Sequence, residues 1–335
     1  MTRPALVTGA GGFIGSRLVS RLREAGQPVR ALLLPAEPVP AAWDEDVEII
    51  RGDITDISAR SRAADGAGSV FHLAAVVGDW GPEALFRRVT VEGTRGMLEA
   101  AARNRSRFVL ASSIVVYGHR LGRERCVEAL PHGRAFGPYG RSKQAQERLA
   151  RDWLDRGTDV RIVRPANVFG PGSRVWVDEV IRLLRTGAPT LIDGGRGNAG
   201  LVHVDNVVDI LVRAASDRGR PGDVFNACDE LAVSWRRYFS DLAALAKTRL
   251  PRSLPSWLAW PLASTLEPLW RLARSAKRPP LTREALQLVS SDHRVPAERA
   301  REVLGHASLL DYSQAIGGLS EYAARSGMPG TGRSG

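Results

Sequence analysis

The chain has 335 residues, enough for one large or two modest domains. Its two cysteines, Cys126 and Cys228, cannot form a disulfide framework, and no secretory signal opens the chain, so we expect a cytoplasmic protein. The net charge of +11 comes almost entirely from scattered arginines. No recognition helix, zinc finger or RNA-binding signature accompanies them, so nucleic acid is not an expected partner.

The first predicted elements are a strand, a glycine turn and a helix. Ala5–Thr8 is a short apolar strand, and helical spacing runs from Phe13 to about Ala25. Between them Gly9, Gly12 and Gly15 stand three residues apart. Glycines in such a turn permit a sharp bend and let the backbone approach a pyrophosphate, while the helix N-terminus offers free N–H groups to phosphate. This stretch therefore predicts a dinucleotide-binding site.

The following elements alternate between strand and helix. Strands are predicted at Val29–Leu34, Val47–Arg51, Ser69–Leu73, Arg107–Ala111 and Val160–Arg164, and helices at Pro82–Arg103 and Tyr139–Leu154. This alternation is typical of right-handed βαβ units and predicts a Rossmann-type, doubly wound parallel sheet in an α/β fold. We expect residues 1–171 to form the dinucleotide-binding domain, with parts of 200–228, including Val224–Cys228, completing its sheet.

After Pro171 the pattern changes to that of a smaller, mostly helical substrate domain. Amphipathic helices are predicted at Val177–Leu184 and Val207–Ala215, and short strands at Leu191–Asp193 and Leu201–Val204. We expect residues 172–325 to form mainly the substrate-binding region, and the glycine-rich residues 326–335 to be a disordered tail.

Candidate catalytic residues follow the fifth strand, near the edge where parallel sheets bind ligands. Tyr139 and Lys143 are four residues apart, so one helix face carries both side chains. An ammonium group beside a phenol favours the phenolate and lowers its pKa, which suits the tyrosine to exchange a proton with a substrate oxygen. Ser112 and Ser113 end the fifth strand, where a hydroxyl could hold that oxygen.

The motifs, taken in order, resemble those of an extended short-chain dehydrogenase/reductase of the NAD-dependent epimerase/dehydratase superfamily. They are Gly9-x-x-Gly12-x-x-Gly15, Gly52-Asp53-Ile54, His72-Leu73-Ala74-Ala75, Ser112-Ser113 with Val116-Tyr117-Gly118, Tyr139-x-x-x-Lys143 and Arg164-Pro165-Ala166-Asn167-Val168-Phe169-Gly170-Pro171. By this resemblance Tyr139 is the general acid/base and Ser113 orients the substrate oxygen. Lys143 lowers the pKa of the tyrosine and binds the nicotinamide ribose.

The resemblance also implies which residues contact NAD or NADP, and it implies no metal. Besides Tyr139 and Lys143, these are Gly9, Gly12, Phe13, Ile14, Gly15, Asp53, Ile54, Ala74, Ala75, Pro165, Asn167 and Val168.

The sequence departs from the family pattern at two places. Leu33 and Leu34 occupy the strand end where many members carry an acid for NAD or a base for NADP, which leaves the choice of cofactor open. Thr90 replaces an asparagine, which puts the role of that asparagine in doubt.

The substrate is predicted from an apolar segment at residues 254–272. It holds three tryptophans and three prolines, Pro255, Pro261 and Pro268, which are too many breaks for a membrane-spanning helix. Arg249, Arg252, Arg271 and Arg274 lie around its ends. It suits either a membrane-surface contact or a buried lid, and both favour an apolar substrate.

The C-terminal half resembles the 3β-hydroxysteroid and sterol dehydrogenase branch, which implies interconversion of a secondary alcohol and a ketone. Relevant motifs are Val76-Val77-Gly78-Asp79-Trp80-Gly81, the run Leu201–Val207, Pro280-Leu281-Thr282 and the run Ala300–Gly305. The alternatives are a biosynthetic ketone or aldehyde reductase, a nucleotide-sugar epimerase or dehydratase with bound NAD, and a non-enzymatic cofactor sensor. The family resemblance also implies a homodimer formed through the helices at 82–103 and 139–154.

Overall fold

The structure, a computed structural model, describes residues 3–43, 46–275 and 277–325, so the expected tail at 326–335 lies outside the described residues. Seven parallel strands form the central sheet in the order β10-β6-β5-β4-β1-β2-β3. They are β1 (Ala5–Thr8), β2 (Val29–Leu33), β3 (Glu48–Arg51), β4 (Ser69–His72), β5 (Arg107–Ala111), β6 (Val160–Pro165) and β10 (Val224–Ala227). The order reverses between β1 and β4, which confirms the predicted doubly wound sheet.

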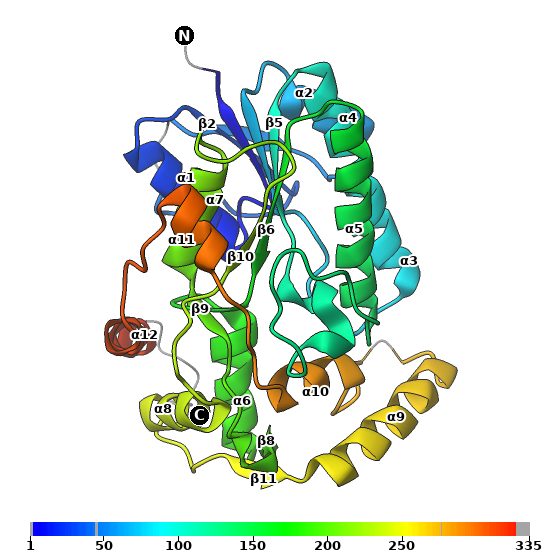
Figure 1. Ribbon diagram of the computed structural model, residues 1–335, viewed down its shortest axis with the longest axis vertical. Coiled ribbons are helices and arrows are strands. Elements are labelled where there is room, and N and C mark those ends of the chain that lie inside the picture. The colour runs from blue at the N-terminus through cyan, green and yellow to red at the C-terminus, as the bar shows by residue number, and fades with distance from the viewer. Residues whose placement is uncertain (1–2, 44–45, 276, 326–335) are drawn as a thin grey trace.

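Helices cover both faces of this sheet (Figure 1). One face carries α1 (Phe13–Glu24), α7 (Val204–Ala214) and α11 (Glu298–Leu304), and the other carries α2 (Ile57–Ala64), α4 (Gly93–Arg103) and α5 (Pro138–Asp155). Two apolar clusters fill the layers between sheet and helices. Because both faces are covered, the central strands are mostly apolar, with Leu6 and Val7 both fully buried.

The helix predicted at Pro82–Arg103 is interrupted by a wider turn. It consists of α3 (Glu83–Phe86), a π-helical segment at Arg87–Glu92 and then α4. The buried Thr90 lies in the wide turn, where its hydroxyl accepts a hydrogen bond from the Val76 N–H at 3.0 Å. The threonine thus holds the loop that follows β4, which gives the unusual Thr90 a structural role.

Most elements after β6, apart from α7, β10 and α11, lie beyond the carboxyl ends of the strands (Figure 1). Two small parallel sheets pair β7 (Asn167–Phe169) with β9 (Leu201–His203), and β8 (Pro189–Ile192) with β11 (Arg252–Leu254). The remaining elements are a π-helical turn (Arg174–Asp178), α6 (Glu179–Thr186), α8 (Trp235–Leu245), α9 (Ser256–Leu272), α10 (Arg283–Ser290), α12 (Tyr312–Arg325) and the 3₁₀ segments Ile114–Arg120 and Asp193–Gly195.

Helix α9 differs from the expectation for its segment. Pro261 and Pro268 lie inside this one helix, so the expected proline breaks do not divide the segment. Only Ala259, Ala263 and Glu267 of its 17 residues are buried, so the outer face of the helix is exposed. Within the described ranges, no helix is both long and apolar enough to span a membrane.

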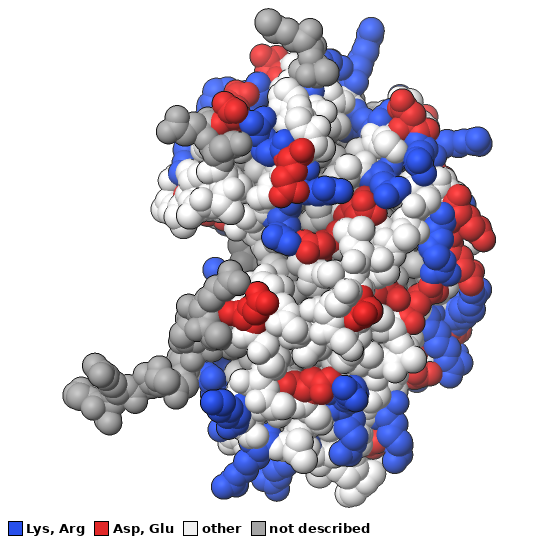
Figure 2. Space-filling view, turned by 90° about the vertical axis from the view of Figure 1, so that its left-hand side faces the viewer, with Lys and Arg blue, Asp and Glu red and all other residues white. Residues whose placement is uncertain are grey.

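Charged side chains of both signs are mixed on the face shown in Figure 2. Arginines alternate there with acidic residues instead of forming one continuous basic stripe. Many of the arginines in the structure are ion-paired, as in Arg17 with Asp205 and Arg107 with Asp159. The positive net charge of the chain is therefore spread out on this face, not focused on one surface feature.

Candidate active site

The glycine turn after β1 has the tight geometry that its sequence predicts. Gly9 has a φ of +65°, and a Cβ at this position would lie 2.9 Å from the backbone nitrogen of Ala74. A Cβ at Gly15 would lie 2.1 Å from the Gly9 carbonyl oxygen. Only glycine fits at both positions, and the loop is pressed closely against the end of β4.

The same turn fits a bound dinucleotide. Gly12 is the N-cap of α1 and is exposed, and no side chain caps the first turn, so backbone N–H groups at this helix end are available to a phosphate. Phe13 and Ile14 begin the helix and are half-buried. A further group, Glu37, was not predicted from the sequence. Its Oε2 accepts a hydrogen bond from the Leu34 N–H at 3.1 Å.

Glu37 places a carboxylate near the end of β2, where Leu33 and Leu34 carry no charge. A Cβ on Gly11 would overlap the Glu37 carboxylate, so the acid lies directly against the glycine turn. Arg51 from β3 donates to the carbonyl oxygens of Leu34 and Glu37 and anchors the backbone of this loop. An acid therefore does lie at the carboxyl end of β2, three residues beyond the position where the sequence pattern places it.

A buried polar chain supports the neighbouring loop. The Thr8 hydroxyl and the Nδ1 of His72 are 2.9 Å apart, and the Nε2 of His72 lies 2.9 Å from the Thr94 hydroxyl. Burial, with a smaller contribution from the Lys143 charge, lowers the pKa of His72 to about 3, so the imidazole stays neutral. The Ala74 N–H donates to the Thr8 hydroxyl at 3.2 Å, which fixes Ala74, and Ala75 after it, at the ligand edge of the sheet.

The other predicted cofactor contacts lie at the same edge but differ in exposure. Asp53 is exposed, and its Oδ1 accepts hydrogen bonds from the backbone N–H and hydroxyl of Thr55. Ile54 is buried in the apolar core, so its side chain is not free to face a ligand. Pro165 ends β6, Val168 lies in β7, and the Asn167 amide donates to the Ala199 carbonyl at 2.7 Å.

Ser113, Tyr139 and Lys143 come together at the end of β5. Ser113 lies near enough to the Tyr139 phenol to lower its pKa. The Lys143 Nζ donates to the Ala111 carbonyl oxygen at 2.8 Å and lies 5.9 Å from the centroid of the Tyr139 ring. The neighbouring Ser112 points elsewhere, donating to Glu147 at 2.6 Å. The structure thus brings together the three residues predicted to be catalytic and separates the two serines.

The expected lowering of the tyrosine pKa by lysine is wrong for this structure. Burial raises the pKa of Tyr139 to about 12, against a smaller lowering by Ser113. Burial also lowers the pKa of Lys143 to about 7, although the nearby Glu147 opposes this shift. The buried lysine therefore holds its positive charge weakly, and the phenol keeps its proton at neutral pH.

A buried ionic network lies beneath this group. The Glu147 carboxylate accepts hydrogen bonds from Ser112 and from both Nε and Nη2 of Arg164, at 2.9 and 2.7 Å, and lies 2.8 Å from His132. Its hydrogen bonds to these donors outweigh burial, so the pKa of Glu147 is well below its usual range. Arg164 also donates to the Tyr117 hydroxyl at 2.9 Å. The network joins α5 to β5 and β6 and so fixes the helix that carries Tyr139 and Lys143.

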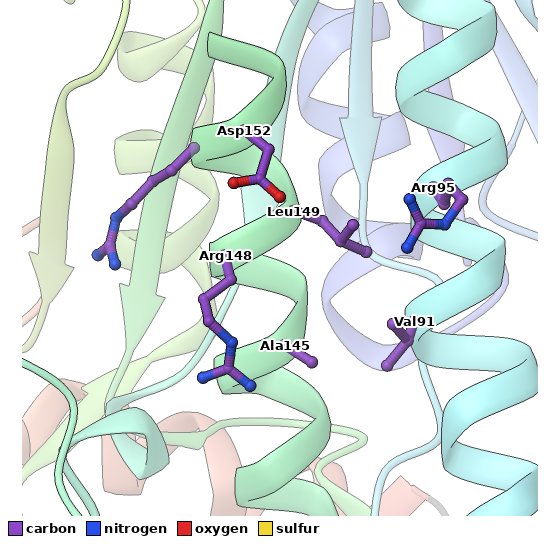
Figure 3. A pocket seen from close by; sticks show the side chains of 7 residues that line it. Val91, Arg95, Ala145, Arg148, Leu149 and Asp152 are labelled. Atoms are coloured by element: carbon purple, nitrogen blue, oxygen red, sulfur yellow. The ribbon is translucent and has the colours of Figure 1, made fainter. Parts of the chain in front are cut away.

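A surface groove lies on the opposite side of α5 (Figure 3). It is lined by Val91, Arg95, Ala145, Arg148, Leu149, Arg151 and Asp152. Helical periodicity places Arg148 and Asp152 away from the face that carries Tyr139 and Lys143. The groove is therefore separate from the candidate active site and lies between the two helical segments expected to form a homodimer.

The sheet order and the glycine turn at the ligand edge define a dinucleotide-binding fold of the α/β class. The chain belongs to the NAD dependent epimerase/dehydratase family, which matches residues 5–228 and confirms both the family resemblance and the nicotinamide dinucleotide cofactor.

Three similar proteins show the range of this family. A 4-hydroxy-2-methyl-3-oxo-4-farnesyl-3,4-dihydroquinoline-1-oxide ketoreductase of Stigmatella aurantiaca is 27% identical, over 96% of this chain and 98% of the relative. A 3 beta-hydroxysteroid dehydrogenase/Delta 5-->4-isomerase of Mycobacterium tuberculosis is 28% identical, over 93% and 88%. The structure of MoeE5 in complex with UDP-glucuronic acid and NAD is similar with a TM-score of 0.74 and 29% identity, over 96% and 99%.

Proposed function

We propose that this protein is an NAD-dependent oxidoreductase that interconverts a secondary alcohol and a ketone on an apolar, steroid-like substrate. The observation that carries the proposal is the convergence of Ser113, Tyr139 and Lys143 at the carboxyl end of β5, on the ligand edge that also holds the glycine turn. Ketoreductase and steroid dehydrogenase relatives that cover nearly the whole chain support the same reaction type.

The side chains divide the chemistry between them. The dinucleotide supplies or accepts the hydride when bound. Tyr139 gives its phenolic proton to the substrate oxygen in ketone reduction and takes it back in alcohol oxidation. Ser113, which lies near the phenol, orients that oxygen. Lys143, held by its hydrogen bond to the Ala111 carbonyl oxygen of β5, would bind the nicotinamide ribose and place its charge near the phenol.

Helix α9 supports an apolar substrate. Its Trp260 ring lies 5.5 Å from that of Phe136, two residues before the helix of Tyr139 begins at Pro138. Near the other end of α9, Arg271 lies over the ring of Trp80, in the loop after β4. The helix therefore packs on two loops that border the candidate site and gives this border aromatic and aliphatic groups.

Glu37 supports NAD over NADP. Its carboxylate lies against the glycine turn at the end of β2, where an acid can accept hydrogen bonds from the adenosine ribose. A 2′-phosphate placed there would be repelled by the like charge of this acid. Arg51 is close, and its Nη1 donates to two backbone carbonyl oxygens, those of Leu34 and Glu37.

The outer face of α9 supports contact with an anionic membrane surface, from which an apolar substrate could be taken. Trp257, Leu258, Leu262, Leu269 and Leu272 are all exposed on this helix. The exposed arginines around it are Arg249, Arg252, Arg271 and Arg274. An apolar face with basic residues at both ends matches the chemistry of an interface with anionic lipid.

A nucleotide-sugar epimerase is the second candidate, favoured by the similarity to MoeE5. The two reactions leave the dinucleotide in different states, because an epimerase returns the hydride to its own substrate and an oxidoreductase releases a changed cofactor. Purified protein should be supplied with a 3β-hydroxysteroid and NAD, with a β-keto ester and NADH, and with UDP-glucuronic acid. Net change in nicotinamide absorbance with an apolar substrate is expected, whereas sugar epimerisation without net change would overturn the proposal.

A further inference from the structure

Two threonine hydroxyls hold the loop that follows β4. The Ala74 N–H donates to the Thr8 hydroxyl at 3.2 Å, and the Val76 N–H donates to the Thr90 hydroxyl at 3.0 Å. Both threonines are fully buried. Thr8 ends β1 and Thr90 lies in the π-helical turn before α4, so two separate elements fix the loop. Ala75, between the two anchored N–H groups, is thereby held at the ligand edge of the sheet.

Thr94 connects these two anchors. Its hydroxyl donates to the Thr90 carbonyl oxygen at 2.5 Å and lies 2.9 Å from the Nε2 of His72. A hydroxyl has one proton, and that of Thr94 goes to the carbonyl, so the Nε2 of His72 is the donor to Thr94. Burial lowers the pKa of His72 to about 3, so the neutral ring leaves its Nδ1 free to accept from the Thr8 hydroxyl at 2.9 Å. The hydrogen bonds therefore all run in one direction, from the loop through the ends of β1 and β4 to α4.

Gln146 joins the same path to the helix that carries Tyr139 and Lys143. This glutamine of α5 is fully buried, and its Nε2 donates to the Thr94 hydroxyl at 2.6 Å and to the Thr90 carbonyl oxygen at 3.3 Å. Its Oε1 has no hydrogen-bond partner among the residues that the structure describes, so the amide acts here through its nitrogen. The Thr94 hydroxyl donates one hydrogen bond and accepts two, which is its full capacity.

Thr90 takes part in this arrangement twice. Its hydroxyl accepts from the loop, and its carbonyl oxygen accepts from both Thr94 and Gln146. The turn that carries it is π-helical, a form that is frequent at functional sites. The threonine that replaces the family's asparagine therefore serves the loop with its side chain and the rest of the path with its backbone.

We propose that Thr94 is a positioning residue for the dinucleotide, because its hydroxyl joins both anchors of the loop at residues 74–76 to the helix that carries Tyr139. The inference rests on the proposed function in one respect, that Ala74 and Ala75 contact NAD. The path of hydrogen bonds holds this loop at a set place relative to the proton donor before the cofactor binds. Without the path, NAD would have to order the loop as it binds, at a cost in affinity.

The test compares Thr94→Val, Thr94→Ser and Thr158→Val. Valine keeps the shape of threonine but removes the three hydrogen bonds of the hydroxyl, and serine keeps the hydroxyl. Thr158 is also buried but precedes β6 at the amino end of the sheet, so it is the matched control. The measurements are NAD affinity by calorimetry, thermal unfolding, and kcat and KM for NAD with an apolar alcohol.

We expect Thr94→Val to weaken NAD binding about tenfold, as is usual when buried polar groups lose their partner. The KM for NAD should rise to a similar extent, and kcat at saturating NAD should stay unchanged, because bound NAD restores the loop. Thr94→Ser should restore the affinity. Thr158→Val should bind NAD like the wild type even where it lowers the unfolding temperature.

The tautomer of His72 gives a second readout that a general loss of stability would not change. Nitrogen-15 spectra, assigned by comparison with His72→Gln, should show the proton on Nε2 in the wild type and in Thr158→Val. In Thr94→Val the Nε2 proton loses its acceptor, so the spectra should change toward a mixture of both tautomers.

Equal NAD affinity in Thr94→Val and Thr158→Val would overturn the proposal and leave the path with a purely structural role. If Thr94→Val does not fold, Thr90→Val replaces it, because this change removes only the hydrogen bond to Val76 and should also weaken NAD binding. If no alcohol or ketone is turned over, the proposed function fails, but NAD affinity and the histidine spectra still decide the role of Thr94.

Discussion

The nucleotide half and the substrate half of this molecule form their binding features in different ways. In the nucleotide half, the glycine turn is formed by the backbone alone. A Cβ on Gly15 would meet the Gly9 carbonyl oxygen, and a Cβ on Gly9 would meet Ala74, which follows the neighbouring strand β4. In the substrate half, side chains connect distant segments, such as the Glu284 carboxylate of α10 with the Gly140 N–H of α5, 144 positions apart. The cofactor site is therefore encoded in short motifs, whereas the substrate site depends on how the C-terminal helices pack.

The largest effect should come from the residue where the two halves meet. Tyr139→Phe removes the proton donor while keeping the ring, so turnover should fall about 10²–10⁴-fold, as is usual for loss of a general acid or base. Binding of NAD, measured by calorimetry, should change little. Turnover close to that of the wild type would remove Tyr139 from the mechanism.

A second prediction tests whether NAD binding needs a glycine turn that is free of side chains. Gly15→Ala places a methyl group against the Gly9 carbonyl and should weaken NAD binding at least about tenfold, or ~1.4 kcal/mol. Gly317→Ala on α12 is the matched control, because nothing lies within 4 Å of a Cβ there. Thermal unfolding of both variants separates loss of binding from loss of fold. Equal NAD affinity in the two would contradict the close packing of this turn.

A third prediction concerns the acid at the end of β2. Glu37→Gln removes the charge next to the glycine turn and should shift the ratio of NAD to NADP affinity by about tenfold toward NADP. Glu48→Gln, on the exposed side of β3, serves as the control. The measurement is cofactor binding by fluorescence quenching. A ratio that stays constant in Glu37→Gln would argue against Glu37 as a ribose ligand.

The smallest effect on chemistry is expected on the outer face of α9. Trp257→Ser with Leu269→Ser should lower binding to vesicles of anionic phospholipid roughly tenfold, because two exposed apolar side chains are lost from the contact without a change of charge. Turnover of a dissolved substrate should stay the same. Leu309→Ser, a change at another exposed leucine, is the control. Vesicle sedimentation that does not differ between the variants would leave α9 without a lipid-binding role.

The sequence predicts the nucleotide half well because its features are local. The strand order and the convergence of Tyr139 and Lys143 follow from spacing, and both are present in the structure. The rise in the pKa of Tyr139 could not be predicted, because its largest cause is burial by the whole fold.

Other groups were missed for related reasons. Glu37 lies in the loop after β2 that folds back on the glycine turn, and the family motif covers only the last residues of the strand. Glu284 comes from a helix that only tertiary packing brings to α5. The continuity of α9 could not be predicted either. Pro261 and Pro268 indicate breaks in the sequence, but both lie inside one helix in the structure.

One measurement tests the central claim most directly. The protein is incubated with a bulky apolar ketone and NADH that carries deuterium at the transferable position of the nicotinamide, and the product is examined by mass spectrometry. We predict an alcohol with deuterium on the carbinol carbon, formed by the wild type and nearly absent with Tyr139→Phe. Deuterium that remains on the dinucleotide, while a sugar nucleotide is epimerised by the same protein, would contradict the account.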